Sequence, residues 1–443
     1  MILDDLARHA AERPAADALV TPAERCSYGE LAGRVAARAG ASSPGRTVPV
    51  PDGDGATFLV DFLAALRAGA RPLVLHQAPT PFELAGLTGQ QAADDEVARG
   101  EILLPTSGST AEPRIARLGQ EAVAWNAAAH ARSVGLVGEG HRLLIAGSLA
   151  HAATLVAQVA AGLQLGAALV VAPRPFTARA FFETVSRERV TATALTPTHV
   201  RWLLDPRADR ALAAVDVACL QIVTVGSAPV DPEAIRGLAL RFPAARVFVT
   251  YGLTEAGPRV TTLAPEDFAA HPDSVGRPLP GVAVRVAHPA DPHRELPPGT
   301  EGELQVLTPG RMRGYLGEPP PAGDWLRTGD LAVMDADGFV TLRGRLKEII
   351  VSGGAKISPR EVERALCEDD RVQEAAVVAE PHEALGEVVK AYVVPAAPLD
   401  ADEILAALAT RLSAHKLPRR LVVVDALPRT PAGKVDKRRL GAT

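Results

Sequence analysis

The segment ARVFVTYGLTE (245–255) joins an apolar run to polar residues of a kind that bind ligands. Residues 245–251 are rich in valine and are followed by a glycine, which predicts a short strand buried on both faces. The runs ALVVA (168–172) and QIVTV (221–225) have the same character. Helical patterns alternate with such strands through most of the chain, so the sequence predicts an α/β fold with parallel sheet.

Helices are indicated near the N-terminus by apolar periodicity and by end signals. Residues 1–14 predict an amphipathic helix that ends before Pro14, with one face formed by Leu3, Leu6, Ala7 and Ala10. The segment SYGELAGRVAARAG (27–40) begins with a capping box, Ser27 and Glu30, and stops at Gly40. Both ends of this second helix are therefore marked in the sequence.

The composition is that of a large globular protein. The chain has 443 residues, of which 47% are hydrophobic and 22% charged, which suits two or three structural units and argues against disorder. A net charge of −5, without a cluster of basic and aromatic residues, argues against a nucleic-acid partner. Three widely spaced cysteines argue against a disulfide framework and a zinc site. The acidic N-terminal residues do not form a signal peptide, so we expect a cytoplasmic protein.

The stretch from Leu143 to Pro173 has no Asp, Glu, Lys or Arg and is long enough to cross a membrane. It also contains His151, Gln158 and Gln164, and it includes the strand-like run ALVVA. These features favour a buried helix followed by a buried strand, so we expect no membrane span.

The C-terminal third of the chain has a different texture. From about Gly299 it consists of short strand segments and turns, including a hairpin at Asp337-Gly338, which predicts antiparallel sheet. After Lys347 the pattern predicts a helix from Ser358, two strands, a helix near 402–414 and a last strand. We expect a large domain (1–346) of layered α/β sheets with a small β-barrel-like part, and a small mobile α+β domain (347–443).

The loop TSGSTAEPR (106–114) combines hydroxyl groups, small residues and one cation after an apolar run. Its hydroxyl and backbone N–H donors suit phosphate oxygens, and the arginine offsets their charge. Taken alone, such a loop is more often a solvated turn, so its meaning depends on partners elsewhere. The candidate phosphate-binding residues are Thr106, Ser107, Gly108, Ser109, Thr110 and Arg114.

Polar residues also follow the strand 245–251, namely Tyr251, Gly252, Thr254 and Glu255. An aromatic face, a glycine that permits close approach, a hydroxyl and a carboxylate thus meet at the carboxyl end of a parallel strand, where α/β sheets commonly hold ligands. One carboxylate together with substrate phosphates and water is a site that Mg2+ accepts. Glu255 is therefore the candidate metal ligand.

These two segments, together with later ones, resemble the adenylate-forming superfamily, which includes acyl-CoA synthetases, aryl-CoA ligases, adenylation domains of peptide synthetases and luciferases. The resemblance runs from about residue 25 to the end of the chain. It implies that the loop 106–114 holds the β- and γ-phosphates of ATP, with Ala111 and Arg114 in place of the family's glycine and lysine. It also implies an AMP-forming ligase whose cofactors include ATP and Mg2+.

The resemblance implies that two segments of the chain contact the adenine base of the nucleotide. The turn formed by Gly226, Ser227, Ala228 and Pro229 is similar to the family's adenine-side turn. Tyr251 matches the residue whose ring stacks on adenine, and Thr254 and Glu255 match the positions that bind phosphate and Mg2+.

Three later residues carry the rest of the resemblance. Asp330 matches the aspartate that accepts both ribose hydroxyls, and Arg345 matches a nearby arginine that contacts the nucleotide. Lys434 matches the lysine that reaches the carboxylate and the α-phosphate, where a cation stabilises the charge that develops during adenylation. Lys347 matches the hinge on which the C-terminal domain swings between adenylation and thiol transfer.

The acid substrate is constrained by the segment SLAH (148–151), which resembles the family's histidine beside the acyl pocket and the thiol tunnel. No Asp or Glu occurs from His141 to Phe182 to pair with a substrate ammonium, so an α-amino acid is disfavoured. The resemblance implies that the small residues Ala152, Ala153 and Gly257 line the acyl pocket, where they should leave room for an aryl or medium acyl group. His151 is thus the candidate acyl-site residue.

The segment SGGAKISP (352–359) looks like that of coenzyme A ligases, in which Gly353 and Gly354 let a pantetheine chain pass close to the backbone. The segment LTPT (195–198) is also similar to one common in acyl-CoA synthetases. Coenzyme A is therefore favoured as acceptor, and an acyl carrier protein is the alternative partner. The sequence does not distinguish a monomer from a homodimer.

One region departs from the family pattern. Between the helix near 58–68 and the loop at Thr106 the family usually has a longer stretch, so part of the N-terminal subdomain is shortened here. This leaves two alternatives open: capture of the adenylate by an amine, and a non-catalytic member that binds nucleotide without turnover. The preferred prediction is activation of a carboxylic acid with ATP, release of pyrophosphate and transfer of the acyl group to coenzyme A.

Overall fold

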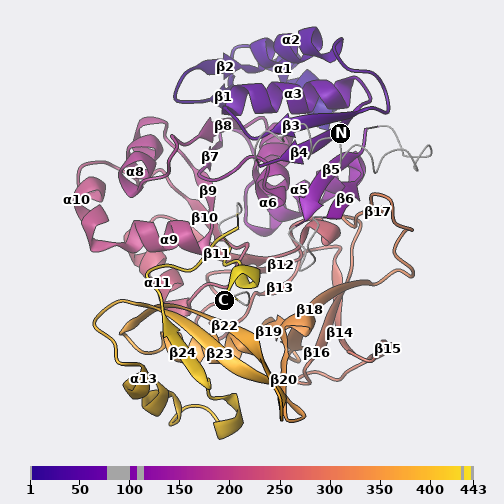
Figure 1. Ribbon diagram of the computed structural model, residues 1–443. Coiled ribbons are helices and arrows are strands. Elements are labelled where there is room, and N and C mark those ends of the chain that lie inside the picture. The colour runs from indigo at the N-terminus through magenta and orange to yellow at the C-terminus, as the bar shows by residue number, and fades with distance from the viewer. Residues whose placement is uncertain (1, 77–99, 107–113, 431–433, 441–443) are drawn as a thin grey trace. The chain divides into compact units, whose positions relative to one another are not determined.

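The computed structural model describes residues 2–76, 100–106, 114–430 and 434–440 (Figure 1). The chain forms two compact units. The first unit comprises Met1–Val284 and Val306–Leu326, and the second comprises Arg285–Gln305 and Arg327–Thr443. The hinge expected near Lys347 falls within the second unit, and both it and the boundary at 346/347 stay predictions.

The first unit is built on a nine-stranded sheet with the order β13-β12-β11-β10-β9-β7-β8-β1-β2. Its six central strands run parallel, and they are β11 (Arg246–Tyr251), β10 (Ile222–Val225), β9 (Ala192–Leu195), β7 (Arg142–Ile145), β8 (Ala168–Val171) and β1 (Asp17–Val20). Antiparallel strands complete the two edges, namely β12 (Thr261–Leu263), β13 (Arg277–Pro278) and β2 (Arg25–Ser27). The parallel strands predicted at 168–172, 221–225 and 245–251 are confirmed.

A second, five-stranded sheet in this unit has the order β17-β6-β5-β4-β3. Strands β3 (Thr47–Pro51), β4 (Arg71–Leu75) and β5 (Ile102–Thr106) run parallel. Strands β6 (Arg114–Leu118) and β17 (Gly314–Tyr315) are antiparallel to their neighbours. One side of this sheet therefore consists of β5 and β6, which flank the predicted phosphate loop. The short strand β17, from much later in the chain, forms its edge.

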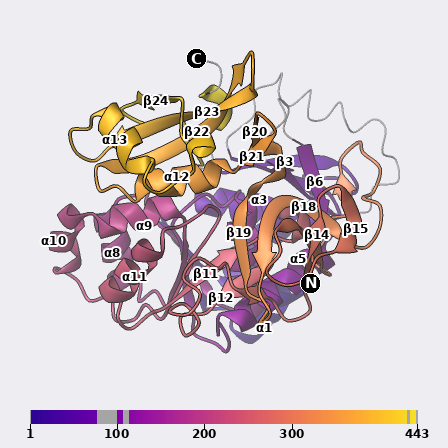
Figure 2. The ribbon, with the colours of Figure 1, turned by 90° about the horizontal axis from the view of Figure 1, so that it is seen from below.

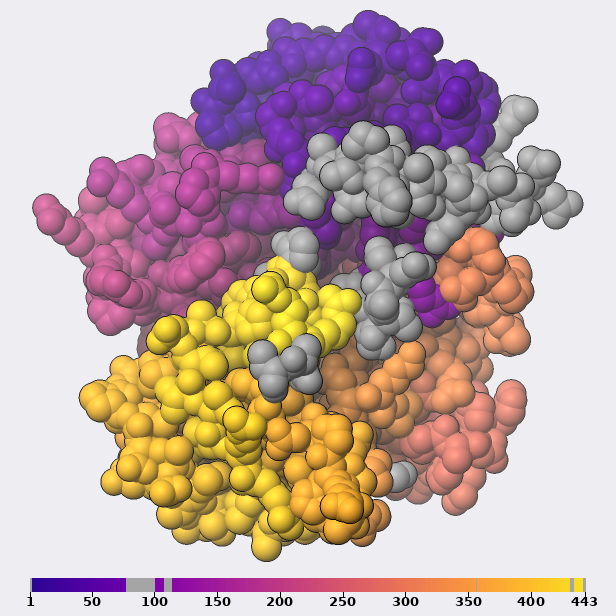
Figure 3. Space-filling model, in the orientation of Figure 1, coloured from indigo at the N-terminus to yellow at the C-terminus, as the bar shows by residue number. Residues whose placement is uncertain are grey.

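Helices α1 (Ile2–Glu12), α2 (Tyr28–Ala39) and α3 (Gly55–Arg67) lie together near β1 to β4 (Figure 1), and Figure 3 shows the indigo and purple N-terminal part of the chain gathered together. The capping box predicted at Ser27 and Glu30 is confirmed. The predicted face of α1 is partly wrong, because Ala7 is exposed and His9 is buried in its place. The His9 ring packs 5.2 Å from the Tyr28 ring.

The uncharged stretch from Leu143 to Pro173 forms β7, a buried helix and β8, as predicted. The helix consists of α6 (Ala152–Thr154), a π-helical stretch (Leu155–Ala160) and α7 (Ala161–Leu165). It packs against α5 (Gln120–Ser133). Of the helices in the described parts of the chain, none is both long and apolar enough to cross a membrane.

Four helices gather beside β9 to β11 in the first unit (Figure 2). They are α8 (Ala178–Arg187), α9 (Pro197–Leu204), α10 (Asp209–Leu212) and α11 (Pro232–Arg241).

The second unit contains two five-stranded assemblies. The first has the order β15-β14-β16-β18-β19, comprising β15 (Asp291–Glu295), β14 (Ala283–His288), β16 (Gly302–Leu307), β18 (Leu326–Met334) and β19 (Val340–Arg345). The second comprises β21 (Ala355–Ile357), β20 (Ile350–Ser352), β23 (Gly386–Pro395) and β22 (Val372–His382), with β24 (Arg420–Val423) parallel to β23. The hairpin predicted at Asp337-Gly338 joins β18 to β19.

Two helices complete the second unit, α12 (Pro359–Cys367) and α13 (Ala401–Leu408). Helix α13 ends before the predicted residue 414, and a 3-10 turn (Ala414–Lys416) follows. The α/β fold class with layered sheets and a C-terminal α+β part is confirmed.

Helix α9 begins with a reciprocal cap that contains a titratable group. The Thr196 backbone N–H donates to His199 Nδ1 at 3.2 Å, and the His199 backbone N–H donates to Thr196 Oγ1 at 3.5 Å. Burial lowers the pKa of His199 from its ordinary 6.5 to about 4. The folded protein therefore holds this imidazole neutral over a range in which the unfolded chain protonates it.

We expect His199→Gln to flatten the dependence of stability on pH. The stabilisation by neutral His199 is complete above pH 6.5 and is lost as the pH falls towards 4, at a cost of roughly 3 kcal/mol. Glutamine keeps a cap acceptor at the same helix position without titrating. Urea unfolding at pH 7 and pH 4.5 measures the difference, and an equal loss of stability in both proteins would contradict the expectation.

Candidate active site

The predicted phosphate loop begins and ends on paired strands. Thr106 closes β5 opposite Arg114, which opens β6, and the Thr106 hydroxyl donates to the Arg114 carbonyl at 3.2 Å. The pairing of β5 with β6 thus holds the two ends of the loop side by side. The predicted binders Ser107, Gly108, Ser109 and Thr110 lie outside the described residues.

Arg114 is held by two side chains from a later segment. Its Nε donates to Glu318 Oε1 at 2.7 Å, and a second guanidinium nitrogen binds Glu318 Oε2. Its guanidinium carbon lies 3.5 Å from the centre of the Tyr315 ring, so the cation also stacks on an aromatic face. The predicted cation therefore has a defined orientation, and a carboxylate shares its charge.

Tyr315 joins this cation to the predicted metal ligand. Its hydroxyl donates to Glu255 Oε1 at 2.7 Å. Burial, and then the neighbouring Glu255 carboxylate, raise the pKa of Tyr315 well above its ordinary value, so the phenol stays protonated and acts as a donor. Arg114 and Glu255, predicted from distant segments, are thus brought together through one residue.

Glu255 and Thr254 lie in a 3-10 turn (Thr254–Ala256) that directly follows β11. The Glu255 carbonyl accepts from the Met312 N–H at 2.9 Å, which ties the turn to the segment before Tyr315. The Tyr315 hydroxyl donates to Oε1, which is one of the two carboxylate oxygens of Glu255. One carboxylate with nucleotide phosphates is a donor set that Mg2+ accepts, so these residues fit the expected ion.

A buried carboxylate holds the strands under this site. Glu101 is fully buried and accepts from Arg117 Nε at 3.1 Å and from Arg313 at 3.1 Å. Arg313 also donates to Glu121 Oε1 at 2.7 Å. Since Arg117 lies on β6 and Arg313 directly precedes β17, this group fixes the strands that carry Arg114 and Tyr315.

Tyr251 and Gly252 occupy the end of β11 as predicted. Tyr251 pairs with Thr261 of β12, and its carbonyl accepts from the Val260 N–H at 2.8 Å. A Cβ atom on Gly252 would come within 2.3 Å of the Pro258 carbonyl oxygen, so only glycine fits there. The close approach of the Pro258 backbone is therefore enough to explain why residue 252 is a glycine, and no bound ligand is needed to explain it.

The adenine-side turn follows β10. A Cβ atom on the buried Gly226 would come within 2.6 Å of the Thr250 carbonyl oxygen, so this glycine lets β10 approach β11. Ser227 has a φ of +72°, a left-handed backbone that favours glycine, and Ala228 is exposed. The turn therefore has the strained geometry typical of ligand-binding segments.

We expect side-chain size at Ser227 to control stability through the backbone. Ser227→Val should destabilise the protein by roughly 1–2 kcal/mol, because a β-branched residue tolerates positive φ poorly. Ser227→Gly should be neutral or slightly stabilising, because relief of strain offsets the extra freedom of the unfolded chain. Urea unfolding of the three proteins tests this, and equal stability of the valine and glycine variants would contradict it.

His151 is the N-cap residue of α6, in the segment that follows β7, and it lies beside a histidine that sequence reasoning missed. Its ring centre lies 6.2 Å from that of His76, which follows β4. His76 Nδ1 lies 3.1 Å from Ser148 Oγ, and burial lowers the pKa of His76. The structure thus brings two imidazoles and a hydroxyl together, and only the spatial meeting of the two sheets reveals His76.

In the second unit, the predicted site residues Asp330 and Arg345 form an ion pair with each other. They are paired across β18 and β19, and Arg345 Nε lies 2.9 Å from Asp330 Oδ1. The Asp330 side chain is 7% exposed and the Arg345 side chain 53%, so the carboxylate is the fixed partner. The Asp330 N–H donates to Thr328 Oγ1 at 3.0 Å, which further fixes its position.

Gly353 and Gly354 form the two-residue turn between β20 and β21, with φ values of +55° and +85°. Such a turn requires positive φ at both positions, so the hairpin by itself accounts for both glycines. Lys434 lies in a return of the chain, where its carbonyl accepts from the Thr430 N–H at 2.8 Å. The roles of these three residues in binding stay predictions.

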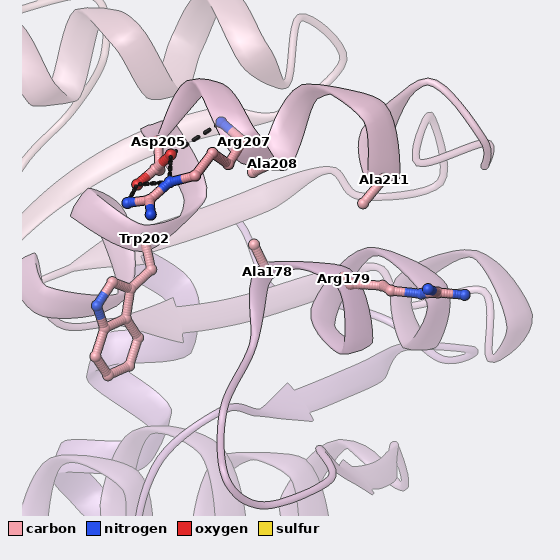
Figure 4. A pocket seen from close by; sticks show the side chains of 7 residues that line it. All are labelled: Ala178, Arg179, Trp202, Asp205, Arg207, Ala208 and Ala211. Atoms are coloured by element: carbon pink, nitrogen blue, oxygen red, sulfur yellow. Dashed lines mark hydrogen bonds and ion pairs between the residues drawn. The ribbon is translucent and has the colours of Figure 1, made fainter.

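A separate hollow of about 190 Å3 lies among α8, α9 and α10 in the first unit (Figure 4). Asp205 and Arg207 form an ion pair at 2.7 Å beside it, and the Arg179 side chain points away from this pair. Its lining residues are Ala178, Arg179, Trp202, Asp205, Arg207, Ala208 and Ala211. None of them is a predicted site residue, so we do not assign this hollow to the nucleotide.

The layered α/β sheets and the site at their edge define an enzyme of the adenylate-forming class. The family model described as "AMP-binding enzyme" matches residues 93–316, and that described as "AMP-binding enzyme C-terminal domain" matches residues 361–434. The chain belongs to the AMP-binding enzyme family. The predicted adenylate-forming superfamily is thereby confirmed.

Similar proteins include two ligases. The chain is 36% identical over 347 residues to an indoleacetate–CoA ligase of Aromatoleum aromaticum, an alignment that covers 76% of this chain and 66% of that protein. It is 35% identical over 356 residues to a feruloyl-CoA synthase of an Amycolatopsis species, covering 76% and 68%. The chain therefore aligns with about two thirds of the length of these relatives.

A solved structure matches over the whole chain. The amide bond synthetase McbA of Marinactinospora thermotolerans has a TM-score of 0.85 and 26% identity, and the match covers 100% of this chain and 99% of that one.

We expect Tyr315→Phe to weaken the hold on Glu255. Loss of a hydrogen bond to a carboxylate should raise the Mg2+ concentration for half-maximal pyrophosphate release by roughly threefold to tenfold. Tyr28→Phe is the matched control, because the Tyr28 hydroxyl donates to a backbone carbonyl at 2.9 Å beside α1. An unchanged Mg2+ requirement in Tyr315→Phe would remove Tyr315 from the site.

Proposed function

We propose that this chain activates a carboxylic acid with ATP and transfers the acyl group to coenzyme A. In the first step a carboxylate oxygen bonds to the α-phosphorus, and the bond from that phosphorus to pyrophosphate breaks. In the second step the thiol sulfur bonds to the acyl carbon, the thiol loses its proton, and AMP leaves with the bonding electrons. Both products of the acid, adenylate and thioester, are thus accounted for.

The observation that carries the proposal is the chain of contacts from Arg114 through Tyr315 to Glu255. It supports a site in which Arg114 and the loop from Thr106 bind phosphates, while Glu255 and Thr254 hold Mg2+ and phosphate. When bound, Mg2+ held by Glu255 and Thr254 would supply positive charge against the developing charge of the leaving pyrophosphate. The residues of the protein orient the nucleotide so that its α-phosphorus can be attacked.

The remaining roles follow from the family resemblance. Tyr251 would stack on adenine next to Gly226 and Ser227. The buried Asp330 would accept the ribose hydroxyls, with Arg345 beside it, as their ion pair supports. Lys434 would stabilise charge on the carboxylate and the α-phosphate during the first step.

The names of the two similar ligases support an aryl acid as substrate and coenzyme A as acceptor. The absence of acidic residues from His141 to Phe182 supports exclusion of α-amino acids. His151, which lies next to His76, is proposed to act in the acyl-transfer step. Gly353 and Gly354 are proposed to lie along the pantetheine path.

A second candidate function is transfer of the acyl group to an amine. It is favoured by the match to an amide bond synthetase over the whole chain. Transfer to an acyl carrier protein is a third possibility of the same chemistry. These acceptors share the first step, so the adenylate is tested first and the acceptor second.

We expect the protein with ATP, Mg2+ and an aryl acid to yield a hydroxamate when hydroxylamine traps the adenylate. Lys434→Ala should lower this rate by roughly 100-fold to 1000-fold, because a cation at the developing charge is lost. Arg439→Ala, which removes an exposed cation from the same segment, should leave the rate unchanged. The measurement is hydroxamate formed and pyrophosphate released.

The same assay separates the alternatives. If no hydroxamate and no pyrophosphate form with any aryl, fatty, β-amino or α-amino acid, the result would favour a non-catalytic nucleotide-binding protein. With the best acid, a product that requires coenzyme A would support the thioester, and a product formed only with an amine would overturn coenzyme A as acceptor.

A further inference from the structure

Arg259 is a buried cation that no carboxylate of the described residues neutralises. Its side chain is among the buried polar groups of the core, with 4% of the residue exposed. One terminal nitrogen donates to the Pro258 carbonyl at 3.0 Å, and Nε has no hydrogen-bond partner. Within the described ranges, no Asp or Glu lies at ion-pair distance from Arg259, whereas the partly buried Arg117 pairs with Glu101.

The charge of Arg259 persists in spite of burial. Loss of hydration lowers the pKa of Arg259 to about 10, which is still far above neutrality. A cation taken out of water without a counter-charge is strongly unfavourable. Among the described residues nothing supplies the missing counter-charge, so a ligand that carries a negative charge would be stabilised beside Arg259.

Two polar side chains of α5 face Arg259. Asn126 is fully buried, and its Nδ2 donates to the Arg259 carbonyl at 2.8 Å. His130, one turn further along α5, is 3% exposed, and burial followed by the charge of Arg259 sets its pKa well below the ordinary value. Asn126 Oδ1 and His130 Nδ1 both lack hydrogen-bond partners. A neutral imidazole beside a cation leaves the positive charge of the group uncompensated.

The group lies next to a residue expected to line the acyl pocket. Gly257 has a φ of +65°, and a Cβ atom there would come within 3.1 Å of Asn126 Cγ. The Arg259 N–H in turn donates to the Gly257 carbonyl at 2.5 Å. Arg259 thus belongs to the same short segment as Glu255, on the side of α5.

We infer that Arg259, with His130, binds a second acidic group of the carboxylic acid substrate, so that the enzyme prefers a diacid. This rests on the proposed function, because the first carboxylate is the one adenylated. A guanidinium offers paired N–H donors to a carboxylate, and Asn126 holds the backbone that carries it. A cation at this place also disfavours an ammonium group on the substrate, in agreement with the exclusion of α-amino acids.

The test compares two acids of one skeleton, 3-phenylpropanoate and 3-(carboxyphenyl)propanoate. In the wild-type protein we expect kcat/KM for pyrophosphate release to be roughly 10-fold to 100-fold higher with the diacid, mainly through KM. Arg259→Met should remove or invert this preference while activity with the monoacid persists. Arg259→Lys should keep part of it, because the charge remains but the paired donors are lost.

Stability without ligand distinguishes binding from a merely structural role. Removal of an uncompensated charge should leave the melting temperature of Arg259→Met unchanged or higher by roughly 2 °C, whereas loss of a structural arginine would lower it. Arg241→Met is the control, since Arg241 is also largely buried but pairs with Asp209. It should lower the melting temperature and leave the acid preference intact.

Failure of the inference differs from failure of the proposed function. Turnover with a preference for the monoacid that Arg259→Met does not alter would overturn the inference alone. If neither acid is turned over, the proposed function is contradicted for these acids. The inference about Arg259 is then tested by the binding of the two acids, measured as a change in melting temperature. A rise in melting temperature with the diacid that Arg259→Met abolishes would then support it, and no rise would overturn it.

Discussion

The first unit depends on one buried carboxylate, that of Glu101, and on the two arginines that satisfy it. A carboxylate removed from water is costly unless charged donors surround it, and loss of one partner of such a group typically costs about 3–5 kcal/mol. Arg117 comes from the adjacent hairpin strand and Arg313 from a segment more than two hundred residues away in sequence. Because Glu101 requires both, the strand that carries Tyr315 must lie beside the strand that carries Arg114.

Everything proposed for phosphate and metal binding follows from that arrangement. Tyr315 lies between Arg114 and Glu255, so the distance between a cation and a carboxylate is set by one rigid ring. The two ends of the loop 106–114 are fixed by the pairing of β5 with β6. A site that must act on a charged transition state benefits from groups placed before the substrate arrives.

Features with local causes could be predicted from the sequence. The capping box of α2 and the parallel strands β8, β10 and β11 depend on neighbouring residues, and all were anticipated. The buried face of α1 was partly wrong, because His9 looks polar in sequence and only its packing against Tyr28 makes it a core residue. Tyr315, Glu318 and His76 were missed for a related reason. Their contacts connect segments that lie far apart in the chain, and nothing in their own segments indicates charge pairing or catalysis.

Other residues show the limit of reading glycines as binding signals. Gly353, Gly354 and Gly252 fit the family's ligand-binding segments, yet a tight turn and a close backbone crossing explain them equally well. Ser227 is more informative, because a non-glycine residue with positive φ is unfavourable and no hairpin demands it. Arg259 is more informative still, since its buried charge has no explanation within the described chain.

Under the proposed function, the ion pair between Arg114 and Glu318 means that nucleotide binding exchanges one anionic partner of Arg114 for another. A phosphate that reaches this guanidinium must displace a carboxylate already bound to it, so the gain equals the difference between two similar attractions rather than the whole of one. Glu318 would then be released into solvent as the triphosphate enters and would return when pyrophosphate departs. Competition by the Glu318 carboxylate would keep the affinity of Arg114 for pyrophosphate moderate. Moderate affinity favours release of pyrophosphate and the start of a new catalytic cycle.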